Sequence, residues 1–514
     1  MREELKGDCH RPIWMRWGRG FLPALGAGTL LSSSFIGVLL KAANRQDLFW
    51  GRADTAALFF VVALGSGLAY VAYLLLNRLT GGRFAGICKP GIFLILAVGV
   101  VQLVPQKFLA HHGWPIDATY GAILGVGAAC AAISAFKRMG KLSSALWRGV
   151  GGLSVLFPIL FFHVLRFPPF IARDDLVPGV PGLQRTAAPS VVVFIFDSIS
   201  MAQCWDDNGQ WRSDLPELGK LRSDSVCLDH AVSCGPGTTT SLPNLLFQRS
   251  PMEYSDNIWD DSRFSVDPQG FTNGVFYLAK QNGYRTGMLG YYLPFGQMFG
   301  ALLDGAKDVP FSRYVAPDSF WDRCVNGAVC VAAYARGPFD GSILAGIPRL
   351  RYLPGRLNEN YFLRITRQTE GIVRSHLACL APSGQLFVSF MAIPHSPAIF
   401  LSDGTVDTVR ATYDSQLQYA DKVVGSFLET LKETGAYDAC WVILTSDHGH
   451  HGFDLPHAQH RNVPFIVKPP GGDRARSVAD PVNLWELGPF FGRVFGGSDP
   501  AACLAALFPE GNPK

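Results

Sequence analysis

The chain has 514 residues with a formal net charge of +4, and 48% of its residues are hydrophobic. This length exceeds what one ordinary core accommodates, so two or more domains are expected. No basic run or cluster of aromatic and arginine residues indicates nucleic acid, so a nucleic-acid partner is not expected.

The first 170 residues are mostly apolar and aromatic and contain few acids. Five stretches within them reach or approach the roughly 20 residues that a helix needs to cross a bilayer. These stretches are residues 20–42, 55–77, 85–104, 119–136 and 147–165. A series of this kind favours a multi-pass transmembrane domain at residues 1–166 over a soluble helical core. The stretches carry few of the acids and bases that transport requires, which disfavours a transporter.

Basic residues predict how these helices are oriented. Several precede the first stretch, and no small-residue cleavage site follows it, which indicates an uncleaved anchor. Lys and Arg also collect in the second and fourth connections, although Lys41, Arg45 and Arg52 weaken the contrast. The positive-inside rule then places the N terminus in the cytoplasm. We therefore expect a protein integral to the cytoplasmic (inner) membrane, with everything after about residue 170 on the periplasmic or extracellular side.

Cysteine usage fits an oxidising compartment. Eight of the eleven cysteines lie in the outer portion, where disulfides persist. Cys324 and Cys330 are predicted to pair because they are close in sequence within a Gly-containing loop. The pairing of the other six cannot be deduced from sequence.

A proline-containing linker at 167–189 is predicted to lead into a second domain at 190–514. Strand and helix patterns alternate there, which is typical of an α/β sheet with helices on both faces. Strands are predicted at residues 190–196, 284–290, 385–392, 440–446 and 463–468, and helices at 273–281 and 410–434. Residues 300–365 are irregular and are interpreted as a loop-rich insertion near the site.

Two of the predicted strands end in acids. The apolar run 441–444 leads into Thr-Ser-Asp447-His448-Gly-His, and the strand 190–196 is followed by Asp197. Ligands of open α/β sheets bind at the carboxyl ends of the strands. Carboxylates beside a neutral imidazole favour a first-row metal, most typically zinc. The sequence therefore predicts a metal site at this edge of the sheet.

A third segment, Cys-Gly-Pro-Gly-Thr238-Thr-Thr-Ser-Leu-Pro, places glycines and hydroxyls before a helix start. Such a start offers free backbone N–H groups and the positive end of the helix dipole to an anion. A threonine hydroxyl there becomes a competent nucleophile when a metal lowers its pKa. Alone, the segment would be read as a Thr/Ser-rich N-cap; beside two acid-terminated strands, it favours the site.

The order of these motifs, with Pro394-His395 and a histidine before the last strand, resembles the alkaline phosphatase/sulfatase superfamily. Membrane stretches followed by such a domain resemble its membrane-bound phosphoethanolamine and phosphoglycerol transferases. The resemblance implies a central, mostly parallel sheet with helices on both faces. It also implies that the metal ligands are Asp197, Thr238, Asp447 and His448.

The resemblance further assigns catalytic roles. Thr238 would take the phosphoryl group, and His395 would contact the substrate phosphate or the leaving group. One of His457 and His460 matches the last site histidine of the family; His460 is nearer to the pattern, and the choice stays open.

Two departures from the family pattern matter. Cys234 resembles the cysteine that sulfatases convert to formylglycine, but Thr238 stands where that motif has arginine and the helix register is four residues off. Asp197 is followed by Ser198 rather than by a second acid, and His395 also lacks the acid that accompanies it in two-metal members. One tight metal is expected, Zn²⁺ most typically, although oxygen-rich ligand sets also accept Mn²⁺ or Mg²⁺.

The resemblance implies transfer of a phospholipid head group, phosphoethanolamine or phosphoglycerol, through a phospho-threonine intermediate to an envelope glycan or lipid. One alternative is a sulfatase-like phosphodiesterase or sulfuric ester hydrolase. An alternative of another class is a non-catalytic membrane protein that binds lipid or senses the envelope. The head group and the acceptor are left open.

Overall fold

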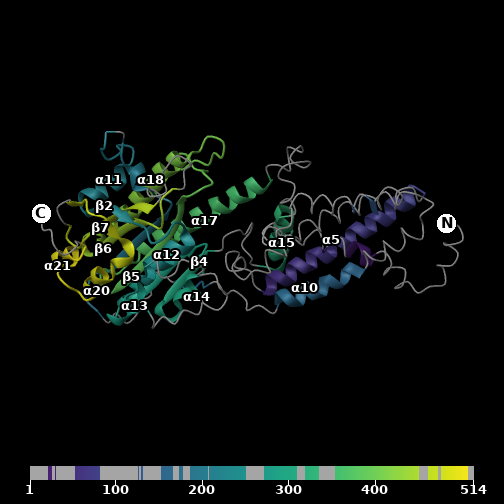
Figure 1. Cartoon of the computed structure of the whole chain (residues 1–514), viewed down its shortest axis with the longest axis horizontal. Helices are drawn as coiled ribbons and strands as arrows, with labels where there is room; N and C mark the ends of the chain where they lie inside the picture. Colours follow the sequence, from purple (N-terminus) through teal and green to yellow (C-terminus); the bar gives the residue numbers. More distant parts are fainter. Residues whose placement is uncertain are drawn as a thin grey trace. The chain divides into compact units, whose positions relative to one another are not determined.

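The structure is a computed structural model, shown in Figure 1. It describes residues 21–25, 29, 52–81, 126, 129–130, 152–165, 173–176, 186–206, 208–250, 271–309, 319–334, 353–450, 461–472 and 476–507. The chain divides into two compact units. The first contains Met1–Arg45, Trp50–Phe170 and Arg313–Leu357, and the second contains Gln46–Phe49, Ile171–Ser312 and Asn358–Lys514.

The first unit is helical where it is described. Its helices are α5 (Arg52–Leu79), α10 (Leu156–Leu165), which follows a 3-10 turn at Leu153–Val155, and α15 (Phe320–Tyr334). Phe59 of α5 packs edge-on against Phe157 and Phe161 of α10, with ring centroids 5.0 Å apart in both pairs. Apolar and aromatic contacts therefore hold these two helices together.

One helix among the described residues is long and apolar enough to cross a membrane. It spans Ala53–Leu79 within α5 and has a mean hydropathy of 2.1. A single helix of this kind is weak evidence, because core helices and signal sequences pass the same test. The predicted stretch 55–77 lies inside α5, and 147–165 overlaps α10. The stretches 20–42, 85–104 and 119–136 lie wholly or mostly outside the described residues.

The second unit is built on one nine-stranded sheet with the order β4-β3-β5-β1-β6-β7-β2-β8, and β9 pairs with β2. The strands are β1 (Val191–Asp197), β2 (Val226–Val232), β3 (Arg285–Tyr291), β4 (Gly305–Val309), β5 (Gln385–Pro394), β6 (Trp441–Ser446), β7 (Asn462–Lys468), β8 (Arg476–Val478) and β9 (Val482–Asn483). The pairs from β4 through β6 are parallel, and β7 runs antiparallel to β6 and β2. The predicted α/β domain with a mostly parallel central sheet is confirmed, and β7 makes the sheet mixed.

Helices cover both faces of this sheet. They are α11 (Pro216–Ser223), α12 (Thr238–Phe247), α13 (Val275–Gln281), α14 (Phe295–Phe299), α17 (Leu353–Leu377), α18 (Tyr413–Glu433), α19 (Ala436–Ala439), α20 (Gly488–Phe495) and α21 (Pro500–Ala505). Short 3-10 turns lie at Met201–Cys204, Gly300–Leu302 and Leu484–Glu486. All seven residues of β1 are buried, as expected for a strand covered on both sides.

The register of two strands shows which helix lies on which face. Phe194 of β1 stacks on Phe427 of α18, and Trp441 of β6 packs edge-on against Phe490 of α20. Trp441 pairs with Val191 of β1, three residues before Phe194. Because side chains alternate along a strand, Trp441 and Phe194 point to opposite faces. Helices α18 and α20 therefore cover opposite faces of the sheet.

The structure corrects two expectations about residues 300–365. Cys324 and Cys330 lie six residues apart in one helix, α15, which separates them by about 9 Å along its axis. A disulfide needs Cα atoms within about 7 Å, and Cys324 is a free thiol, so the predicted pair is wrong. The segment is also not uniformly irregular, because it contains β4, α15 and the first part of α17.

Candidate metal centre

Adjacent parallel strands bring the predicted acids to one edge of the sheet. Strand β1 ends at Asp197, and its neighbour β6 ends at Ser446, directly before Asp447. On the other side of β1, strand β5 ends at Pro394, whose Cα pairs with that of Asp197. The carboxyl ends of three strands thus meet where ligands of α/β sheets bind.

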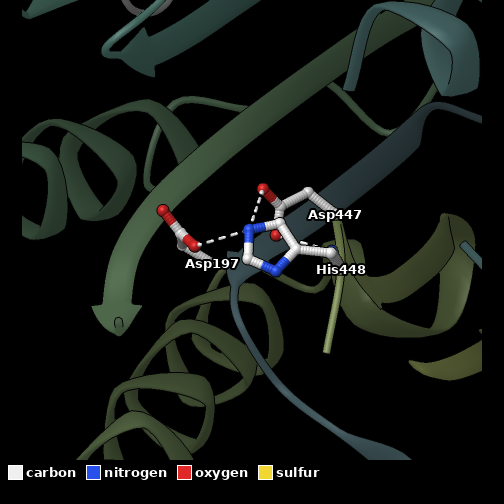
Figure 2. A group of neighbouring side chains, drawn as sticks. All are labelled: Asp197, Asp447 and His448. Carbon is white, nitrogen blue, oxygen red and sulfur yellow. Dashed lines mark hydrogen bonds and ion pairs between the residues drawn. The ribbon is translucent and has the colours of Figure 1, made fainter. Parts of the chain in front are cut away.

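Figure 2 shows the His448 ring directed at the carboxylates of Asp197 and Asp447. Its Nε2 atom lies 3.5 Å from Asp197 Oδ1 and 3.5 Å from Asp447 Oδ2. Thr238 Oγ1 lies 3.3 Å from the same nitrogen. All four predicted metal ligands are therefore brought together. Among the described residues, the three in Figure 2 form the one group of His, Cys, Asp and Glu side chains whose ligand atoms lie within 4.8 Å of one another.

The geometry of this group fits a cation. Donor atoms 3.5 Å apart match the edge of roughly 3.4 Å in a tetrahedron with metal–ligand bonds of about 2.1 Å. Asp447 Oδ2 is buried and has no hydrogen-bond partner among the described residues, a position that calls for an ion or a water molecule. Two carboxylates, an imidazole and a hydroxyl suit zinc and also accept manganese or magnesium.

The charges of these side chains also favour a bound cation. Burial raises the pKa of Asp447; the charge of His448 opposes this rise and that of Asp197 adds to it. Burial lowers the pKa of His448, but the charges of Asp447 and Asp197, together with the hydrogen bond to the Gly449 carbonyl, outweigh burial and raise it. The protein thus buries more negative than positive charge here, and a bound cation would relieve the imbalance.

The turn after β1 orients both carboxylates. Ser198 has φ of 73°, a left-handed conformation that costs a non-glycine residue about 1 kcal/mol. In this conformation its hydroxyl donates to Asp197 Oδ1 at 2.9 Å, and its backbone N–H donates to Asp447 Oδ1 at 3.2 Å. The strained residue therefore holds the two carboxylates in a fixed relation.

A helix begins in this segment, as predicted; Thr238 is the first residue of that helix, α12, and is 8% exposed. One turn later, Ser241 donates its hydroxyl hydrogen bond to the carbonyl of Asp447, which ties the helix start to the loop after β6. Gly235 allows this approach, because a Cβ atom there would lie 2.9 Å from the Ser241 backbone nitrogen. The positive end of α12 thus faces the side chains of Asp197, Asp447 and His448.

Cys234 is a free and fully buried thiol four residues before Thr238. Burial raises the pKa of this thiol well above its ordinary value, despite the opposing charge of Arg461. A thiol that stays protonated is a poor nucleophile. This environment agrees with a structural role for Cys234.

Of the predicted site histidines outside the motif at Asp447-His448, the structure describes His395 but not His457 or His460. His395 follows Pro394 at the same edge of the sheet and is half-buried, and its Nδ1 lies 2.5 Å from the carbonyl oxygen of Ser396. It does not belong to the group of Asp197, Asp447 and His448, the three described residues whose ligand atoms lie close enough to hold one ion. His457 and His460 lie outside the described residues, so both remain predictions.

Tyr291, the last residue of β3, is a site residue that sequence reasoning missed. Its phenol donates a hydrogen bond to Asp197 Oδ2, and its ring stacks on Phe390 of β5 with centroids 4.8 Å apart. Burial and the charge of Asp197 raise the phenol pKa well above 10, so the hydroxyl remains a donor. The available signal was its position at the end of a predicted strand close to β1.

Replacing Tyr291 with phenylalanine is expected to weaken metal binding and activity by about 10- to 100-fold, because the second oxygen of Asp197 loses its donor. Metal affinity should be measured by competition with a chelator. Tyr292→Phe, which removes the neighbouring phenol, is the matched control. Unchanged metal affinity and activity in Tyr291→Phe would show that this hydrogen bond does not support the site.

The mostly parallel sheet and the buried carboxylate–imidazole group at its edge define an α/β domain suited to holding a metal ion. The sulfatase family model matches residues 189–497, and the chain belongs to this family, within the alkaline phosphatase/sulfatase superfamily. Superfamily members are metal-dependent enzymes.

A curated relative, the multifunctional alkaline phosphatase superfamily protein PehA of Trinickia caryophylli, is 30% identical over 127 residues. The match covers 22% of this chain and 25% of PehA, so the chain spans about a quarter of the length of that relative. The solved phosphonate monoester hydrolase of Agrobacterium radiobacter is 16% identical, with 63% of this chain and 78% of that chain covered and a TM-score of 0.38. A solved protein in the alkaline phosphatase superfamily from Vibrio parahaemolyticus is 14% identical, with 65% and 72% covered and a TM-score of 0.38. The family assignment rests on the family model.

Proposed function

We propose that the protein transfers a phospholipid head group, phosphoethanolamine or phosphoglycerol, to an envelope glycan or lipid through a phosphorylated Thr238. The observation that carries the proposal is the contact of 3.3 Å between Thr238 Oγ1 and Nε2 of His448, within a buried group of metal-ligand type. This hydroxyl lies both beside a candidate cation site and at the start of a helix. A cation would favour the attacking oxygen, and the cation and the helix start would both favour an anionic phosphoryl group.

In the first half-reaction, Thr238 Oγ1 forms a bond to phosphorus and the bond from phosphorus to the diacylglycerol oxygen breaks. Asp197, Asp447 and His448 would hold the metal together with Thr238, and we propose zinc. When bound, the metal lowers the pKa of the threonine hydroxyl and neutralises charge on the phosphoryl oxygens. The proton that leaves the Thr238 hydroxyl is balanced by the proton that the leaving diacylglycerol oxygen takes up.

In the second half-reaction, an acceptor hydroxyl attacks phosphorus, the bond to Thr238 Oγ1 breaks, and the threonine hydroxyl is restored. We assign proton transfer and charge binding to His395 and to His457 or His460. Placement of His395 directly after Pro394, whose Cα pairs with that of Asp197, supports its part in this assignment.

A lipid donor accords with the apolar helix α5, which would keep the protein at the membrane that supplies the donor. We therefore retain the proposal of a multi-pass protein of the inner membrane with its catalytic domain on the outer side. Membership of the sulfatase family supports hydrolysis equally well, because the same residues would serve a phosphodiesterase in which water replaces the acceptor. Four assembled ligand residues argue against a non-catalytic lipid-binding protein.

The test is an assay of purified full-length protein in bilayers, with the head group of phosphatidylethanolamine or phosphatidylglycerol radiolabelled and an envelope extract as acceptor. Transfer predicts release of diacylglycerol while the label moves to the acceptor. Free labelled head group at equal yield with or without acceptor would instead identify a hydrolase. Absence of diacylglycerol in metal-loaded protein would contradict both activities.

A further inference from the structure

Helix α15 belongs to the first unit, although the chain before it and after it belongs to the sheet-containing second unit. Strand β4 before it and most of α17 after it lie in the second unit, yet Arg313–Leu357 belongs to the first. There α15 packs against the first turns of α5. The chain therefore contributes one of its later segments to the unit that contains the apolar helix.

Close and specific contacts hold α15 to α5. Arg323 forms an ion pair with Asp54 at 2.8 Å, and the Asp54 side chain is only 3% exposed. Gly327 permits a tight crossing, because a Cβ atom there would lie 3.2 Å from the Cα atom of Leu58. These contacts use one side of α15, on which Cys324 and Gly327 are buried.

The other side of α15 is apolar and exposed. Trp321, Val325 and Ala328 follow one another at intervals of four and three residues, so they share one helix face, and Trp321 is 63% exposed. Phe320, next to Trp321, is exposed as well. We call this surface the α15 face.

The α15 face continues onto α5. Phe60 of α5 contacts the rings of both Phe320 and Trp321, with centroids 5.6 and 5.9 Å apart. From Phe60 on, six of the eight exposed large apolar residues of α5 form one stripe along the helix at helical spacing, and Leu74 and Leu76 are exposed on either side of it. This stripe consists of Phe60, Leu64, Leu68, Val71, Leu75 and Leu79. The exposed surface therefore runs unbroken from α15 along a helix that is long enough to cross a bilayer.

We propose that the α15 face lies in the lipid bilayer, at the level where α5 enters it, so that α15 is an interfacial helix docked on a membrane-spanning one. An apolar face with an exposed tryptophan is typical of helices at the membrane interface. The continuous stripe on α5 favours hydrocarbon as the occupant, because one lipid phase covers both surfaces. The Asp54–Arg323 ion pair lies on the side of α15 away from this face and satisfies both charges within the protein.

This inference rests on the membrane location within the proposed function, and its test needs no turnover. Full-length protein is placed in bilayers of phosphatidylcholine brominated on the acyl chains, and tryptophan emission is compared between wild type and Trp321→Phe. The difference between the two emission spectra is the emission of Trp321. We expect brominated lipid to quench most of this emission and aqueous iodide to leave it unchanged. Trp485→Phe is the control, because Trp485 lies in the second unit. The emission of Trp485, obtained from the same kind of difference, should not be quenched by brominated lipid.

Quenching of Trp321 by iodide instead of bromolipid would place the face in water and overturn the proposal. Resistance to both quenchers would place it against protein, such as a second copy of the chain, and would also overturn it. Equal bromolipid quenching of Trp485 would show that the signal is not specific to α15. Quenching of Trp321 by brominated lipid would still be seen if the protein were a hydrolase or inactive. Absence of this quenching would not change the result of the transfer assay, so the two proposals can fail independently.

Discussion

Thr238→Ala is expected to lower the rate of diacylglycerol release by at least about a thousandfold while leaving the fold intact. The variant removes the hydroxyl that lies 3.3 Å from His448 Nε2 and leaves the side chains of Asp197, Asp447 and His448 in place. Because Thr238 lies at a helix start and is 8% exposed, losing its hydroxyl should cost only about 1 kcal/mol of unfolding free energy. Initial rates with the radiolabelled lipid and a thermal melt measure the two effects separately.

Two variants control this experiment. Thr239→Ala removes the next hydroxyl in the same helix and should keep nearly full activity, and Thr238→Ser should retain part of it because an oxygen nucleophile remains. An active Thr238→Ala together with an inactive Cys234→Ala would move the nucleophile to Cys234. Such a result would contradict the assignment of Thr238 and return the protein to the sulfatase mechanism.

Asp447→Asn is expected to abolish tight metal binding. In the wild type, a metal at about a thousand times its dissociation constant should add about 4 kcal/mol to the free energy of unfolding, and the variant should lose this gain. Without metal, the variant should be at least as stable as the wild type, because it no longer buries Asp447 beside the like charge of Asp197. Metal content by elemental analysis and melting temperature with zinc or with a chelator test both statements.

Asp421→Asn is the matched control, because Asp421 is a buried acid in α18 that accepts hydrogen bonds from the backbone N–H groups of Glu217 and Leu218. This variant should melt at a lower temperature yet keep the full response to zinc. Metal affinity of the wild type should also fall as the pH falls, because protons compete for an Asp447 whose pKa burial raises. Full metal occupancy in Asp447→Asn would contradict the proposed ligand set.

The strands that end at the site could be predicted because their sequences are locally unambiguous. The apolar runs of β1 and β6 are fully buried, and each is followed by an acid, so local pattern and site chemistry coincide. The start of α12 could also be predicted, since glycines are followed by a run of threonine and serine hydroxyls and then by apolar residues, which is a pattern of a helix N-terminus. For the same reason, the four predicted ligands are the residues that the structure brings together.

The missed elements depend on contacts that no local pattern encodes. In β2, the register shifts between Leu228 and Ala231, and the polar pair Asp229-His230 interrupts the apolar alternation there. In β4, the buried Asp308 accepts hydrogen bonds from the backbone of Arg173 and Gly296, so its environment is set by distant residues.

Tyr291 and α15 were missed for the same reason. The partner of Tyr291 in the site, Asp197, is 94 residues away in the chain, and the Asp54 partner of Arg323 is 269 residues away. An amphipathic helix of this kind has no recognisable role until the helix it packs on is known. Sequence spacing also suggested the wrong cysteine pair, because it ignored that a helix separates Cys324 from Cys330.

The most direct test of the central claim is peptide mass spectrometry of purified protein after incubation with mixed phospholipids, with Asp447→Asn beside the wild type. We predict an adduct on the wild-type peptide that contains Thr238, with an added mass equal to phosphoethanolamine or phosphoglycerol less one water, and no adduct in the variant. An unmodified Thr238 peptide with Cys234 converted to formylglycine would contradict the account and identify a sulfatase. An unmodified Thr238 in metal-loaded protein that still releases diacylglycerol would place the nucleophile elsewhere.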